Sequence, residues 1–167
     1  MEAYGIKKNK GYTLIEMICV MAILGIICSI CYPNLNGFIR GQRLNVCTKM
    51  LVNDLRYAKM YAVSKNYPVI NVMFIGDVGK EIYSGYKIYV PGSMENATLK
   101  EKSFYKEIIV DGGKSTISSG IAQNIIEFHA GGYAYPACTI AVCDTFSGKT
   151  KNITLSIGYT RIMEVIK

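Results

Sequence analysis

An apolar run with one acidic residue at its start constrains this chain more than any other feature. The run covers residues 17–32, Glu16 precedes it and Pro33 closes it. Three lysines lie just upstream, at Lys7, Lys8 and Lys10. A helix of about 20 apolar residues crosses the ~30 Å hydrocarbon core of a bilayer, and a basic flank marks its cytoplasmic side. We therefore expect one membrane-spanning helix over residues 12–33, with the rest of the chain outside the cytoplasm.

Glu16 is the exception within this apolar segment. A carboxylate in a spanning helix costs roughly 2.5–3.5 kcal/mol on insertion scales, so it normally has a partner. Cleavage between Gly11 and Tyr12 would create a positively charged amine four residues before Glu16. The carboxylate could then pair with the amine of its own chain or with that of a neighbouring chain.

The stretch Gly11-Tyr-Thr-Leu-Ile-Glu16 resembles the class III signal peptide of type IV prepilins and pseudopilins. The resemblance implies that residues 1–11 are a leader, removed after Gly11 by a prepilin peptidase, and that the Tyr12 amine is methylated. It also implies that Glu16 sets the register of subunits in a filament. Tyr12 replaces the phenylalanine usual in the family, and Pro33 falls where many pilins have a helix-kinking proline.

Helical periodicity resumes after Pro33 and predicts an amphipathic continuation over residues 34–66. Apolar side chains at spacings of three and four form one stripe, namely Leu44, Cys47, Leu51, Leu55, Ala58 and Ala62. No proline interrupts the chain between Pro33 and Pro68. We expect one helix from Tyr12 to about Ser64, bent at Pro33, whose second half buries its stripe against a sheet.

Residues 67–167 read as a β-rich domain. Glycine, asparagine and aspartate clusters separate short runs with strand character, over residues 68–75, 83–90, 104–110, 124–129, 138–143, 152–157 and 161–166. Their spacing favours hairpins, and hence a mostly antiparallel sheet or two sheets. The predicted fold class is α+β, with a long N-terminal helix, membrane-spanning in its first half, packed on an antiparallel sheet.

A second stretch of the chain indicates a more specific family resemblance. The stretch 51–62, LVNDLRYAKMYA, leads into a strand and is similar to the GspH/FimT-type minor pilin pattern. This similarity implies a non-enzymatic structural subunit, without a cofactor. Its partners would be other pilin subunits, the prepilin peptidase, the membrane and the inner-membrane assembly machinery. The subunit would be a single-pass protein of the cytoplasmic membrane, then part of a surface filament: a pilus, a secretion pseudopilus or a competence pilus.

Two cysteines of the predicted domain are close in sequence, Cys138 and Cys143. A disulfide between them and two thiols packed within strands are both open interpretations. The C-x4-C spacing, with one histidine in the whole chain, is poor evidence for a zinc site, and we expect no metal.

The alternative function is DNA binding in a competence pilus, which some FimT-type minor pilins perform. The net charge is +7. Four of the basic residues lie near the C-terminus and would contact DNA, namely Lys149, Lys151, Arg161 and Lys167. Aromatic stacking could come from five tyrosines, Tyr83, Tyr86 and Tyr89 in one predicted strand and Tyr133 and Tyr135 in a glycine-rich turn, although aromatic residues in strands more often pack within the sheet. Gly112-Gly-Lys-Ser-Thr116 lacks the first glycine of a phosphate-binding loop, since position 108 is Ile108, and is interpreted as a turn. His129, Asp111 and Glu127 accompany no nucleophile motif, so an enzyme is disfavoured.

Overall fold

A computed structural model describes residues 11–92, 97–117, 124–156 and 162–165, with side chains described except at 31–34 and 162–165. The chain divides into two compact units, one ending at Ile39 and the other beginning at Arg40. Each unit is described by itself below. The first is the N-terminal part of a long helix, and the second holds the remainder of that helix and the sheet.

The helix α1 runs from Leu14 to Ser64 and matches the predicted helix closely. Its end is a Schellman motif, in which the Tyr67 amide donates to Ala62 O at 3.0 Å and the Asn66 amide donates to Val63 O at 3.3 Å. Asn66 occupies the left-handed region, with φ of 51°. Because Pro68 follows and cannot continue a helix, the chain leaves α1 here and enters the first strand.

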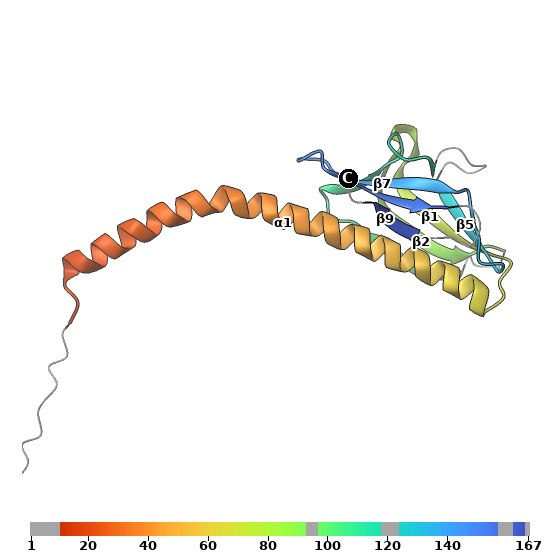
Figure 1. Cartoon of the computed structure of the whole chain (residues 1–167), viewed down its shortest axis with the longest axis horizontal. Coiled ribbons are helices and arrows are strands. Elements are labelled where there is room, and N and C mark those ends of the chain that lie inside the picture. The colour runs from red at the N-terminus through yellow and green to blue at the C-terminus, as the bar shows by residue number, and fades with distance from the viewer. Residues whose placement is uncertain (1–10, 93–96, 118–123, 157–161, 166–167) are drawn as a thin grey trace, which may run out of the picture. The chain divides into compact units, whose positions relative to one another are not determined.

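The described strands all pair antiparallel in one sheet (Figure 1). Their order is β6-β5-β1-β2-β4-β7-β8-β9, and β3 pairs with β2 off this path. The bounds are β1 Val69–Asp77, β2 Ile82–Val90, β3 Ala97–Ser103, β4 Ile108–Asp111, β5 Ile125–His129, β6 Ala134–Tyr135, β7 Cys138–Asp144, β8 Thr150–Leu155 and β9 Ile162–Val165. A 3₁₀ turn, η1 Val78–Lys80, joins β1 to β2. The predicted α+β class, with a helix and an antiparallel sheet, is confirmed.

One edge of β2 serves two partners. Its start, Ile82 and Tyr83, pairs with β4, whereas Gly85 to Val90 pair with β3. At Gly85 the neighbouring backbone is so close that an added Cβ would lie 2.6 Å from Lys102 O. Glycine is therefore required at Gly85, the position on β2 where pairing with β3 begins.

The second half of α1 supplies the helical side of the core. All six residues of the predicted stripe are buried, from Leu44 at 3% exposure to Ala62 at 0%. They join one cluster with buried side chains of the strands, including Ile70, Phe74 and Tyr86. In Figure 1 this part of α1 runs along the sheet. The amphipathic stripe is thus the surface that attaches helix to sheet.

The predicted strands differ from the observed ones in two places. Residues 104–110 do not form one strand, since β4 begins only at Ile108 and the Ile108 amide donates to Tyr105 O at 2.7 Å in a turn. The strand β3 was not predicted. Its sequence, ATLKEKS, is polar on both faces and largely exposed, so it lacks the alternation that identifies a half-buried strand. The two-residue β6 is too short to give a pattern.

Candidate assembly site

The proposed cleavage point precedes the helix. Gly11, Tyr12 and Thr13 lie outside α1, which begins at Leu14. Nothing lies within 4 Å of the position that a Cβ of Gly11 would take, and Tyr12 is 81% exposed. Within its unit, the peptide bond between Gly11 and Tyr12 is therefore in accessible, non-helical backbone, the form that a protease needs.

Thr13 and Glu16 cap the helix reciprocally. The Glu16 amide donates to Thr13 Oγ1 at 3.3 Å, and the Thr13 amide donates to Glu16 Oε2 at 3.5 Å. This pattern is a capping box, which satisfies amides that have no partner within the helix. Glu16 also lies in the first turn, where the helix dipole favours a negative charge. Sequence reasoning gave Thr13 no role, although threonine three residues before glutamate at the start of an apolar run carries this signature.

The helix after Glu16 presents apolar side chains on every side. All described residues from Tyr12 to Ile30 are exposed. Val20 and Leu24 are the least exposed of the large hydrophobic side chains in this stretch, and each is still 48% exposed. No single helix in the described ranges is long and apolar enough to cross a membrane, but the bent pair Leu14–Ile30 and Leu35–Ser64 could do so by length and composition. Pro33 lies in the break between them, and its kinking role remains a prediction. An apolar surface of this extent is a contact surface.

In the globular unit, Asp54 joins α1 to two strands. Asp54 is 4% exposed, and its Oδ2 accepts from the Tyr86 hydroxyl of β2 at 2.7 Å. Its Oδ1 accepts from Lys100 Nζ of β3 at 2.8 Å, and Lys102 Nζ lies 3.4 Å from Oδ2. Lys100 Nζ also lies 4.0 Å from the ring centroid of Tyr57. Asp54, the aspartate of the stretch 51–62, thus has its partners on β2 and β3.

Burial acts most strongly on the pKa of Asp54 and would raise it. The hydrogen bonds from Lys100 and Tyr86, with the charges of Lys100 and Lys102, together outweigh burial and hold this pKa below its ordinary value. The pKa of the Tyr86 hydroxyl is raised, first by burial and then by the Asp54 carboxylate. Asp54 is therefore an ionised acceptor held between three donors, which is a structural role.

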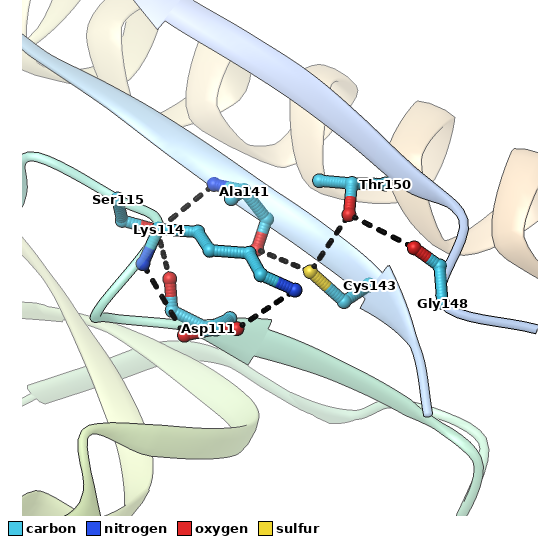
Figure 2. A network of polar contacts seen from close by, with 7 residues as sticks. All are labelled: Asp111, Lys114, Ser115, Ala141, Cys143, Gly148 and Thr150. Carbon is cyan, nitrogen blue, oxygen red and sulfur yellow. Dashed lines mark hydrogen bonds and ion pairs between the residues drawn. The ribbon is translucent and has the colours of Figure 1, made fainter. Parts of the chain in front are cut away.

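Cys138 and Cys143 are not bonded to each other. Both are free, buried thiols of β7. Five residues apart on one strand, they are separated by roughly 16 Å and point to opposite faces. Cys138 joins the core, whereas Cys143 Sγ lies 3.3 Å from the Thr150 hydroxyl (Figure 2). The disulfide interpretation was wrong, and the alternative of two packed thiols is correct.

The residues that resemble a phosphate-binding loop form a turn that is held to β7. Ser115 Oγ donates to Asp111 O and accepts from the Ala141 amide, and Lys114 Nζ lies 3.4 Å from Asp111 Oδ2 (Figure 2). Thr116 Oγ1 accepts from the Thr139 amide at 2.7 Å. Because these polar groups already have partners within the protein, they do not form an anion cradle.

Of the four basic residues proposed for DNA contact, the structure describes two. Lys149 is exposed in the turn between β7 and β8, Lys151 is half-buried in β8, and Arg161 and Lys167 lie outside the described residues. Tyr83 and Tyr86 are 1% and 0% exposed, so they pack in the core and cannot stack on bases. These two tyrosines are therefore excluded from the predicted DNA-binding face, whereas Tyr133 and Tyr135 are 47% and 49% exposed and their role stays a prediction.

The polar candidates for acid–base chemistry have structural surroundings. His129 ends β5, stacks on Tyr133 with ring centroids 4.5 Å apart, and places Nε2 at 3.6 Å from Glu127 Oε2. Asp111 pairs with Lys114. Among the described residues, no group of three or more histidine, cysteine, aspartate or glutamate side chains could hold a metal ion.

Comparisons with known proteins agree with this geometry. Residues 6–32 match the family model described as the prokaryotic N-terminal methylation motif. Over 60 residues, which are 36% of this chain, it is 32% identical to the type IV wide pilus major component PilA4 of Thermus thermophilus. The match spans about half of that protein's length, 46%.

The fold resembles that of a solved minor pilin. A crystal structure of the type IV minor pilin FimU of Pseudomonas aeruginosa has a TM-score of 0.55 and 21% identity, covering 75% of this chain and 90% of FimU. A second crystal form gives a TM-score of 0.54 and 23% identity, over 73% of this chain and 92% of FimU. The chain thus carries an N-terminal methylation motif and is similar to type IV pilins in part of its sequence. Its fold is similar to that of FimU.

Proposed function

We propose that this chain is a structural, non-enzymatic subunit of a type IV filament. Its leader, residues 1–11, is removed by a prepilin peptidase, and the Tyr12 amine is then methylated. The segment 12–33 anchors the precursor in the cytoplasmic membrane, with residues 67–167 outside the cytoplasm. The subunit later leaves the membrane and packs into a filament through the same segment.

The observation that carries this proposal is the combination of the methylation motif with an apolar helix whose side chains are exposed on every side. The motif covers residues 6–32, and the exposed apolar surface covers the described residues from Tyr12 to Ile30. Such a surface is unstable in water and needs lipid or other apolar helices around it. A subunit that moves from membrane to filament exchanges one of these surroundings for the other.

Glu16 is the residue on which assembly depends in this proposal. In the uncleaved chain its carboxylate accepts from the Thr13 amide at 3.5 Å, a long and replaceable hydrogen bond. Removal of residues 1–11 places a charged amine on Tyr12, next to Thr13. Opposite charges attract strongly where water is excluded. A Tyr12 amine of a neighbouring subunit would therefore pair with Glu16 and define the axial step between subunits.

Substitution of Glu16 tests this function in the native cell. We expect Glu16→Ala to reach the membrane at normal levels and to be lost from sheared filaments, as measured by immunoblotting of both fractions. Glu101→Ala removes an exposed carboxylate from β3 and serves as the control, with normal incorporation. Incorporation of Glu16→Ala at the level of the control would contradict the assembly role.

Substitution of Gly11 tests processing separately. Glycine before the cleaved bond leaves space that a branched side chain would fill, so we expect Gly11→Val to accumulate as the full-length precursor. Mass spectrometry of the unsubstituted chain from filaments should show Tyr12 as the first residue, with a methylated amine. Filament material that retains residues 1–11 would overturn the proposal.

A further inference from the structure

The globular unit has one end where arginines and aromatic rings are paired. The guanidinium carbon of Arg40 lies 4.5 Å from the ring centroid of Phe146, and that of Arg43 lies 5.1 Å from the centroid of Tyr105. Both arginines come from the first turns of α1 in this unit. Phe146 and Tyr105 come from the connections that follow β7 and β3. We call these four residues the arginine–aromatic end.

The two rings at this end are unusually exposed. Phe146 is 72% exposed and Tyr105 is 48% exposed. The turn that carries Phe146 is well ordered by hydrogen bonds, because Asp144 Oδ1 accepts from the Phe146 amide at 3.0 Å and Oδ2 accepts from the Ser147 hydroxyl at 2.6 Å. The exposure of Phe146 is therefore built into the turn.

The acidic groups of this end are occupied within the protein. Glu107 forms an ion pair with Arg43, and Asp144 is buried within its own turn. The Thr145 amide donates to Glu107 O at 3.0 Å and links the two connections. Further basic residues flank them, Lys106 beside Tyr105 and Lys149 in the turn after Phe146, and both are exposed. The outer surface of this end therefore carries excess positive charge beside exposed rings.

We propose that the arginine–aromatic end docks on an anionic phospholipid surface while the subunit is held in the membrane. Aromatic rings and basic side chains are the residues that favour the membrane–water interface. Guanidinium groups bind phosphate through paired hydrogen bonds, and an anionic leaflet attracts nearby basic residues. Arg40 follows the expected spanning segment by only seven residues, so the chain that connects this end to the bilayer is short.

This inference rests on the proposed function, since only a membrane-anchored subunit brings this end to a bilayer. A nucleic acid offers phosphates too, but it offers no apolar layer into which a phenylalanine would insert. The exposed Phe146 therefore favours lipid over DNA. The two partners are separated by the experiment below.

The chain contains no tryptophan, so a single introduced indole reports on one position alone. We would reconstitute the full-length Phe146→Trp variant into vesicles of neutral phosphatidylcholine, with or without 30 mol% phosphatidylglycerol, both with brominated acyl chains. We expect at least a twofold loss of indole fluorescence in the anionic vesicles relative to the neutral ones. High salt or the additional substitution Arg40→Gln should reverse it.

The matched control is Met60→Trp, which places the indole on α1 at a position that is 70% exposed and outside the arginine–aromatic end. We expect equal fluorescence in both kinds of vesicle for this variant, and an unchanged circular dichroism spectrum for both variants. Equal quenching of the Phe146→Trp indole in neutral and anionic vesicles would overturn the lipid proposal. Quenching that is abolished by added double-stranded DNA would also overturn it, in favour of a nucleic-acid surface.

Flotation of the vesicles separates this inference from the proposed function. A chain that does not float with vesicles of either composition lacks the membrane anchor, and the proposed function then fails. A chain that floats with both but shows no lipid-dependent change at position 146 is anchored, and only the docking surface fails.

Discussion

The Tyr86 hydroxyl of β2 donates a 2.7 Å hydrogen bond to Asp54 Oδ2 of α1, across the boundary between helix and sheet. Both residues are buried, at 0% and 4% exposure. The other carboxylate oxygen accepts from Lys100 of β3, so one side chain holds the helix to two strands. A buried carboxylate without its donors is strongly unfavourable. The stability of the globular unit should therefore depend on this group.

We expect a double-mutant cycle of Asp54 and Tyr86 to show strong coupling. Asp54→Asn and Tyr86→Phe should each lower the free energy of unfolding by about 1–3 kcal/mol, because each leaves a buried polar group with fewer partners. The coupling energy should be at least about 0.5 kcal/mol. Urea unfolding of the full chain in mild detergent measures these values. Tyr105→Phe, at a half-exposed ring, is the control, and additive effects of the pair would refute the coupling.

The same carboxylate should make stability depend on acid pH. The folded-state pKa of Asp54 is lowered from its ordinary value by Lys100, Tyr86 and Lys102 against the opposing effect of burial. Its unfolded pKa is about 3.9. The stabilisation is therefore fully present above about pH 4 and is lost as the pH falls through the lower folded-state pKa. The stability difference between the native chain and Asp54→Asn should shrink on acidification, and a constant difference from pH 7 to pH 2 would contradict this.

Gly85 should tolerate no side chain, whereas Gly41 should. A Cβ at Gly85 would lie 2.6 Å from Lys102 O and 3.2 Å from Ser103 Cα, both parts of the backbone of β3. We expect Gly85→Ala to destabilise the domain by about 1–3 kcal/mol in thermal unfolding. Gly41 lies within α1 with nothing within 4 Å, so Gly41→Ala should stabilise by up to about 1 kcal/mol. Equal effects of the two substitutions would show that the close approach at Gly85 is not limiting.

Cys138 should be unreactive in the folded protein. Burial raises the pKa of its thiol to about 12, so almost no thiolate exists at pH 8. We expect iodoacetamide to leave Cys138 unmodified under native conditions and to label it after unfolding in urea, as mapped by peptide mass spectrometry. The intact mass should not change on reduction. Loss of two hydrogens at Cys138 and Cys143 in native material would reveal a disulfide and contradict this structure.

Much of the helix and of the candidate assembly site could be predicted because short-range patterns define them. The stripe from Leu44 to Ala62 repeats at helical spacing, and its burial follows from that period. The start of α1 was predicted two residues early, because Thr13 and Glu16 cap the helix at Leu14. That capping pattern is visible in the sequence, but sequence reasoning considered Glu16 only as a charge that needs an amine.

By itself, the sequence determined the exposed apolar segment, the residue at its start, the amphipathic continuation and the antiparallel class of the domain. Only the tertiary structure decided that Asp54 meets Tyr86 and Lys100, that the polar strand β3 joins β2, and that Cys143 of β7 meets Thr150 of β8. The physical reason is the separation along the chain of the residues that interact. Helical periodicity and caps are set by residues three or four positions apart, whereas these contacts depend on which strand edges meet after the chain has folded.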